Sequence, residues 1–109
     1  MDIRISCADI QNGVEFTLSG ELMFMDYQPF IDKVLTSSDR KGPKIRLNML
    51  NLKFIDSAGL GGILYLSEAL RMRGQKLEVF NVNEKVLKLL KVIHAVGSFT
   101  ITETAASCD

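Results

Sequence analysis

Ser57 is the residue whose type and setting most readily suggest chemistry, because a serine can act as a nucleophile or accept a phosphate. As a hydrolase nucleophile it would need a base within hydrogen-bond reach, and His94, the only histidine, is the one candidate. The esterase elbow Gly-x-Ser-x-Gly is absent, since Ile55 occupies the first glycine position. We therefore expect no hydrolase, and we expect His94 to pack or cap at the end of a helix.

The glycine-rich segment Gly59-Leu60-Gly61-Gly62 follows Ser57 closely and could suggest nucleotide binding. The dinucleotide fingerprint, however, requires a glycine or alanine where Leu64 stands, and the phosphate loop requires a Gly-Lys-Ser/Thr that the sequence lacks. We interpret these glycines as sites where the start of a helix lies close to a neighbouring strand or to a partner. No cofactor is implied for this chain.

The segments around Ser57 predict a strand that ends near Leu50 to Leu52, a short turn, and a helix that begins immediately after the turn. Either Asp56 or Ser57 could cap that helix, because the side chain of an N-cap residue accepts a hydrogen bond from a free amide of the first turn. The free amides and the helix dipole would also favour a phosphate on Ser57. On the residues alone, a plain capping serine is favoured over a phosphorylation site.

Hydrophobic periodicity predicts an α/β fold for the rest of the chain. An opening hairpin with an Asn-Gly turn, followed by helices that alternate with strands, indicates a mixed sheet with parallel crossovers. Asp26 is the predicted N-cap of the first helix, and Gly74 the left-handed C-terminal cap of the helix that follows Ser57. The predicted elements are strands at Ile3–Cys7 and Val14–Leu22, a helix from Asp26 to about Ser37, a strand from Lys44, the helix after Ser57, a strand at Leu77–Val82, a helix from Asn83 to about Gly97 and a short strand at Phe99–Ile101.

The composition predicts a single domain over residues 1–109, with an ordered core from about 3 to 101 and a tail, 102–109, that has few apolar residues. Thirteen basic and thirteen acidic residues cancel, which disfavours binding to nucleic acid or to an anionic membrane. The longest apolar run, Ala58–Leu66, is far shorter than the roughly 20 residues of a membrane-spanning helix. Cys7 and Cys108 form neither a disulfide framework nor a metal cluster, which suits the cytoplasm.

The segment Phe54-Ile55-Asp56-Ser57-Ala58-Gly59-Leu60-Gly61 resembles the signature of STAS domains, especially those of bacterial anti-sigma-factor antagonists. Gly20-Glu21-Leu22 fits the second strand of that family, and Leu77–Val82 fits its late strand. The resemblance extends from Ile3 to about Ile101, and it implies a single STAS-like domain.

The resemblance also implies a function. Ser57 matches the serine that a partner anti-sigma factor with serine-kinase activity phosphorylates, and Asp56 matches its acidic neighbour. In such a switch the unmodified antagonist binds the anti-sigma factor and frees the sigma factor, phosphorylation breaks the complex, and a serine phosphatase restores it. The chain itself is then no enzyme, and ATP is a ligand of the partner. The residues expected to contact the partner are Met23, Phe24, Asp56, Ser57, Gly59, Leu60 and Gly61.

One loop departs from the family pattern, because Met23 replaces the usual Asp and Asp26 replaces the usual Thr. The change leaves four consecutive apolar residues, Leu22–Met25, near the predicted position of Ser57. This run is either buried core or an exposed patch that docks a partner or a second copy in a homodimer. A different function is also open: a constitutive accessory subunit of a transporter or signalling assembly, in which Ser57 is only a helix cap.

Overall fold

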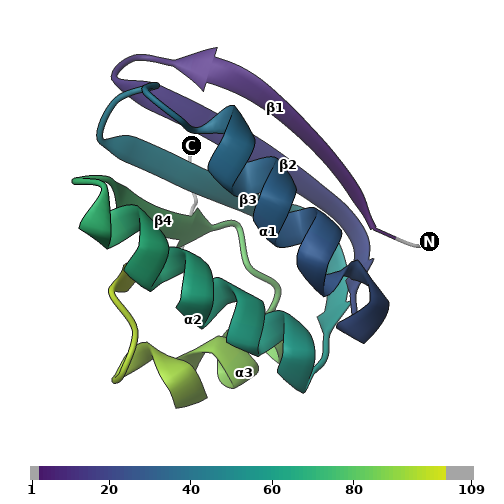
Figure 1. Cartoon of the computed structure of the whole chain (residues 1–109). Coiled ribbons are helices and arrows are strands. Elements are labelled where there is room, and N and C mark those ends of the chain that lie inside the picture. The colour runs from purple at the N-terminus through teal and green to yellow at the C-terminus, as the bar shows by residue number, and fades with distance from the viewer. Residues whose placement is uncertain (1–2, 103–109) are drawn as a thin grey trace.

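The computed structural model describes residues 3–102. Its elements are, in chain order, β1 (Arg4–Ile10), β2 (Gly13–Leu22), the 3₁₀ helix η1 (Phe24–Asp26), α1 (Tyr27–Ser37), β3 (Lys44–Ile55), α2 (Ser57–Met72), β4 (Lys76–Phe80), α3 (Glu84–His94) and β5 (Phe99–Thr102). The strands form one five-stranded sheet in the order β1-β2-β3-β4-β5 (Figure 1). β1 and β2 are antiparallel and the other neighbours are parallel, which confirms the predicted α/β fold with a mixed sheet.

The opening hairpin turns at Gln11 and Asn12, because Ile10 pairs with Gly13. Asn12 supplies the left-handed backbone that the turn requires, with a φ of 67°. Gly13 already belongs to β2, where a Cβ atom would lie 1.6 Å from the carbonyl oxygen of Lys44. Of the predicted Asn-Gly pair, Asn12 therefore lies in the turn, whereas Gly13 lies in β2, where it allows close contact with β3.

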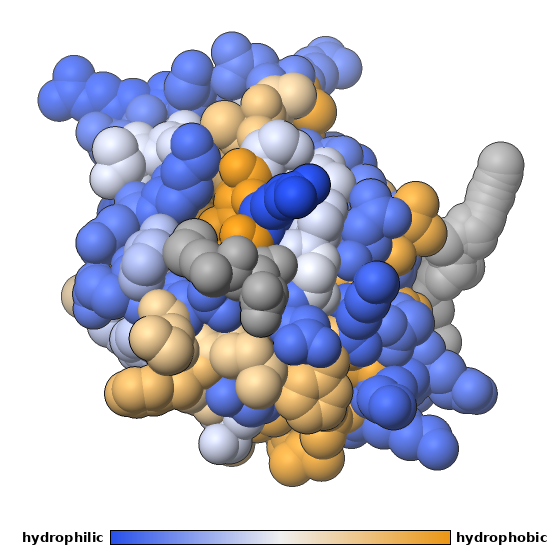
Figure 2. Space-filling view, turned by 90° about the vertical axis from the view of Figure 1, so that its right-hand side faces the viewer, coloured by the Kyte–Doolittle hydropathy of each residue, from blue (hydrophilic) through white to orange (hydrophobic). Residues whose placement is uncertain are grey.

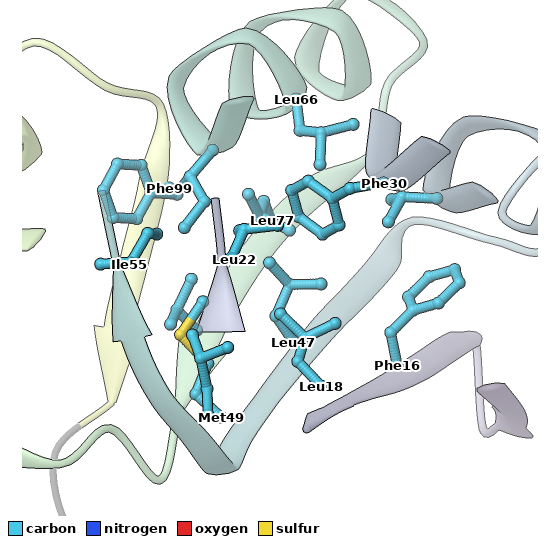
Figure 3. Packing of buried hydrophobic residues seen from close by; sticks show 14 of the residues in the cluster. Phe16, Leu18, Leu22, Phe30, Leu47, Met49, Ile55, Leu66, Leu77 and Phe99 are labelled. Carbon is cyan, nitrogen blue, oxygen red and sulfur yellow. The ribbon is translucent and has the colours of Figure 1, made fainter. Parts of the chain in front are cut away.

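The core lies between the sheet and the two helices, α1 and α2, that cover one of its faces (Figure 1). Alternate residues of β2 and β3 point into it, among them Phe16, Leu18 and Leu47 (Figure 3). Phe30 from α1 and Leu66 from α2 meet them from the helical side, and all five side chains have no exposed surface. α3 contacts α2 and β3, and its buried residues Val86 and Leu90 belong to the same core.

β3 continues to Ile55 and does not end near Leu50 to Leu52 as the sequence predicted. The pairing of β2 with β3 shifts twice, between Thr17 and Ser19 and between Gly20 and Glu21. These shifts let the two strands stay paired to their ends, where Leu22 pairs with Ile55. A single residue, Asp56, therefore separates β3 from α2.

Asp26 directly precedes α1, but its side chain does not cap that helix, which contradicts the prediction. Its carboxylate instead accepts a hydrogen bond from the backbone N–H of Met23, at 3.0 Å. Asp26 is the last residue of the short helix η1, and its side chain bonds back to the residue that precedes this helix. The sequence pattern did not predict η1.

The later part of the chain follows the predicted order. Gly74 has a φ of 77° after the end of α2, and the side chain of Asn83 caps α3 by accepting the N–H of Val86 at 2.8 Å. β4 ends at Phe80 and excludes Val82, because Asn81 adopts a φ of 59° and breaks the strand.

His94 ends α3, with its Nε2 3.1 Å from the carbonyl oxygen of Phe99 and its ring against the Phe99 ring, which confirms the predicted packing role. Thr102 is the last residue of β5, so the last strand includes one residue that was predicted to lie in the tail. The rest of the predicted tail, 103–109, lies outside the described residues. Within residues 3–102, no helix is long and apolar enough to cross a membrane.

Candidate functional site

Asp56 is the N-cap of α2. Its backbone is extended, and its Oδ1 accepts the N–H of Gly59 at 2.8 Å, while its carbonyl accepts the first helical bond from Leu60. The structure thus decides between the two predicted caps, and the hypothesis that Ser57 serves as the cap is wrong. An aspartate in this position is favoured twice, because it satisfies a free amide and its charge meets the positive end of the helix dipole.

Ser57 is the first residue of α2 and is exposed. No residue within 3–102 forms a hydrogen bond with its hydroxyl group. The hydroxyl therefore faces solvent at the positive end of a helix. Ser57 also lies far from His94. The backbone N–H of Ser98, which is close to His94 in the chain, donates to the hydroxyl of Ser67 in α2. Ser67 lies ten residues after Ser57 in the same helix, a rise of about 15 Å.

The second carboxylate oxygen of Asp56 reaches across to another element. Its Oδ2 accepts the backbone N–H of Phe24 at 3.0 Å, although the two residues are 32 positions apart. The backbone N–H of Asp56 in turn donates to the carbonyl oxygen of Leu22, at 3.2 Å. Asp56 therefore joins the end of β2 and the start of η1 to the start of α2.

The Leu22–Met25 run divides between the core and the surface. Leu22 is fully buried and Met23 is half-buried, whereas the side chains of Phe24 and Met25 are 74% and 86% exposed. The end of the molecule that carries η1 and the start of α2 faces the viewer in Figure 2, and apolar surface gathers in the lower half of that view. We call Phe24 and Met25 the apolar tip.

The glycines of α2 have different roles. A Cβ atom on Gly59 would lie 2.6 Å from the carbonyl oxygen of Leu22, so this residue must be glycine for α2 to start so close to β2. This confirms the interpretation of close approach to a neighbouring strand. A Cβ atom on Gly61 would meet nothing within 4 Å, so the fold does not require glycine there.

The seven residues predicted to contact a partner lie in η1 and the start of α2, which touch each other, and at Met23 and Asp56, the residues that directly precede them. Gly59 is buried, so it offers the least free surface of the seven, and Leu60 is half-buried and packs partly on the core. Sequence reasoning missed the exposed Met25, although it lies in the apolar run, and it missed the bond from Phe24 to Asp56. No signal in the sequence indicates that bond, because the donor is a backbone group.

The site has the character of a contact surface. Within residues 3–102, no group of three potential metal-ligating side chains is close enough to hold a metal ion. A hollow of about 490 Å³ lies elsewhere, around the C-terminal end of α2 and the start of β5, where Arg71, Gln75 and Phe99 are among its lining residues. At Ser57 the structure offers an exposed hydroxyl, a fixed carboxylate and an exposed apolar tip.

Comparison with known proteins gives one family and several relatives. The model of the STAS domain matches residues 6–108 of this chain. The anti-sigma-B factor antagonist of Bacillus subtilis (strain 168) is 21% identical over 92 residues, which cover 84% of each protein.

Solved structures share the fold at similar identity. The anti-sigma factor antagonist SpoIIAA in its unphosphorylated form has a TM-score of 0.68 and 20% identity, over 94% of this chain and 89% of its own. SpoIIAA of Bacillus in its phosphorylated form has a TM-score of 0.67 and 19% identity, over 92% of this chain and 90% of its own. The murine Solute Carrier 26 family member A9 anion transporter has a TM-score of 0.70 and 19% identity, over 80% of this chain but 16% of its own. Because the family model matches nearly the whole chain, this protein belongs to the STAS domain family.

Proposed function

We propose that this protein is a protein-binding regulator switched by phosphorylation of Ser57, and that it acts as an anti-sigma-factor antagonist in the cytoplasm. The observation that carries the proposal is the state of Ser57 at the start of α2: its hydroxyl is exposed and has no hydrogen-bond partner within residues 3–102, because Asp56 provides the cap. A serine needed as a cap would have its oxygen committed to the helix. This one is available for modification without loss of a structural bond.

The unmodified chain binds an anti-sigma factor with serine-kinase activity, and the sigma factor is thereby released. The names of the relatives support this partner, since one is an anti-sigma-B factor antagonist. The partner transfers the γ-phosphoryl group of its ATP to Oγ of Ser57, the hydroxyl proton is lost and ADP remains. A serine phosphatase then hydrolyses the ester and regenerates the hydroxyl with release of phosphate. This chain needs no catalytic residue of its own.

Phosphorylation would act on the partner contact more than on the fold. A phosphoserine adds about −1.5 to −2 charge at neutral pH, next to the carboxylate of Asp56. The start of α2 tolerates an anion because free amides and the helix dipole favour it. A partner surface that is apolar or acidic would be repelled, and each ~1.4 kcal/mol of repulsion weakens binding tenfold.

A second candidate is a constitutive accessory subunit of a transporter or signalling assembly. The likeness to the murine anion transporter, at a TM-score of 0.70, is the observation that favours it. In that case the same surface binds its partner permanently and Ser57 is not modified.

Intact-protein mass spectrometry separates the two candidates. The protein is isolated from its own cells, with phosphatases inhibited, under several growth conditions. We expect a fraction that carries one phosphate, located on Ser57 by fragmentation and absent from the Ser57→Ala protein. If no condition yields phosphate on Ser57, the switch is wrong and the constitutive subunit is favoured.

A further inference from the structure

Asp56 makes one bond more than helix capping requires. The bond from Oδ1 to the Gly59 N–H, at 2.8 Å, is the ordinary cap of α2. The bond from Oδ2 to the Phe24 N–H, at 3.0 Å, does nothing for α2, because the donor belongs to another element. Hydrogen bonds to a charged acceptor are stronger than those between neutral groups, so this contact is well suited to hold Phe24 in place.

η1 depends on such contacts because it is only three residues long. Two carboxylates hold its beginning: Asp26 accepts the N–H of Met23, and Asp56 accepts the N–H of Phe24, each at 3.0 Å. Asp26 lies within η1 and fixes its internal shape. Asp56 is the one of the two that fixes η1 relative to α2.

The side chains that η1 carries have few contacts of their own to orient them. Phe24 and Met25 are 74% and 86% exposed, so packing contributes little to their position. An aromatic side chain that contributes strongly to binding must be held in place before the partner arrives, because ordering it during binding costs affinity. The backbone bond to Asp56 provides that order.

We infer that Asp56 is a positioning residue of the partner contact. It holds the apolar tip beside the hydroxyl of Ser57, so that the anti-sigma factor meets both as one surface and inserts the tip into an apolar pocket. This inference rests on the proposed function, because it takes its partner from it. Beyond that function, the inference states that Asp56, the neighbour of Ser57, acts through Phe24, which lies 32 positions away in the chain.

Asp56→Asn tests the inference because the two side chains have nearly the same shape. The amide oxygen can still accept the N–H of Gly59, and Asn is as good an N-cap as Asp. The amide nitrogen is a donor, so it cannot accept the N–H of Phe24. Glu84→Gln removes one negative charge from the exposed start of α3 and serves as the matched control.

The first measurement needs no partner. Amide hydrogen exchange of the purified chain is followed at Phe24 and Gly59. We expect exchange at Phe24 to become about tenfold faster in Asp56→Asn, as for the loss of ~1.4 kcal/mol of protection, while Gly59 stays protected. Glu84→Gln should match the wild type at both positions. Unchanged exchange at Phe24 would overturn the inference and leave phosphorylation of Ser57 untouched.

The second measurement uses the purified kinase-type anti-sigma factor from the same cells and a double-mutant cycle. We expect Phe24→Ala and Asp56→Asn each to weaken binding about tenfold, and the double variant to bind about as weakly as Phe24→Ala alone. If the two losses multiply to about a hundredfold, or if either single variant binds like the wild type, Asp56 does not act through Phe24. If the wild-type chain binds no such factor, the proposed function fails, and with it the partner assigned to this surface.

Discussion

At the scale of single residues, Asp56 and Ser57 have separate tasks. Asp56 accepts two backbone N–H groups, whereas the hydroxyl of Ser57 accepts none within the described chain. The contribution of the turn to stability therefore comes from the aspartate. The serine is free to change its chemical state.

This division predicts different costs of substitution. We expect Ser57→Ala to change the free energy of unfolding by less than about 0.5 kcal/mol, as for an ordinary surface position. Asp56→Ala should cost about 2 kcal/mol, because it removes both the cap of α2 and the acceptor for the Phe24 N–H. Urea unfolding of the wild type and of the two variants measures both changes in the free energy of unfolding. Equal losses for the two variants would mean that the serine shares the capping role.

Charge at position 57 should control partner binding. We expect Ser57→Ala to bind the anti-sigma factor permanently, because it cannot be phosphorylated. Ser57→Asp should bind at least about tenfold more weakly, since an added negative charge needs to cost only ~1.4 kcal/mol for that effect. Ser6→Asp, which places the same charge on the exposed edge strand β1, is the control and should bind normally. Titration calorimetry gives the affinities, and equal binding by Ser57→Ala and Ser57→Asp would contradict the switch.

At the scale of elements, the start of α2 combines a glycine that the fold needs with one that it does not. Gly59 faces the carbonyl oxygen of Leu22, and Gly61 faces open space. A glycine inside a helix costs roughly 0.5–1 kcal/mol relative to alanine. Gly61 therefore lowers the stability of α2, and no contact inside the molecule requires a glycine there. This fits a position where a partner approaches closely.

Alanine at the two glycines should have opposite effects. Gly59→Ala should destabilise the fold by about 1–3 kcal/mol, because a Cβ atom 2.6 Å from a backbone oxygen forces β2 and α2 apart. Gly61→Ala should stabilise it by up to about 1 kcal/mol and yet weaken binding to the anti-sigma factor. Thermal unfolding and titration calorimetry test the pair. A Gly61→Ala variant that is more stable and binds normally would remove Gly61 from the contact surface.

The elements also show where prediction from the sequence succeeds. Periodicity and caps are local, so the hairpin, the order of strands and helices, the start of a helix at Asn83 and the end at Gly74 could all be predicted. The end of β3 could not, because it depends on register shifts in its neighbour β2. Nor could η1, since it is stabilised by the carboxylate of Asp56 from far along the chain.

The candidate site was predictable to a similar extent. The motif around Ser57 predicted a serine at a helix start, which the structure confirms. It could not tell which of two adjacent polar residues makes the cap, because that depends on the backbone angles of the turn. The hydrophobicity of the Leu22–Met25 run left its burial open. The fold places Leu22 inside and the apolar tip outside, because Leu22 is the last residue of a paired strand.

At the scale of the whole molecule, the proposed phosphorylation site is set apart from the core. The buried residues lie between the sheet and the helices, whereas Ser57 lies on the surface at one end of α2 (Figures 1 and 3). The unmodified chain is neutral, with thirteen basic and thirteen acidic residues. One phosphate therefore gives the molecule a net charge of about −1.5 to −2 at neutral pH.

The phosphorylated protein should keep its fold while its charge changes. We expect amide shifts in a two-dimensional NMR spectrum to move only in η1, at Asp56 and in the first turn of α2, because the phosphate lies on the surface and the helix start accommodates its charge. Signals of β4 and α3 should stay in place, the thermal midpoint should not fall, and native electrophoresis should show faster migration toward the anode. Shifts spread across the sheet would mean that phosphorylation alters the packing of the molecule, and the switch would then be a change of fold stability instead of a local change of the contact surface.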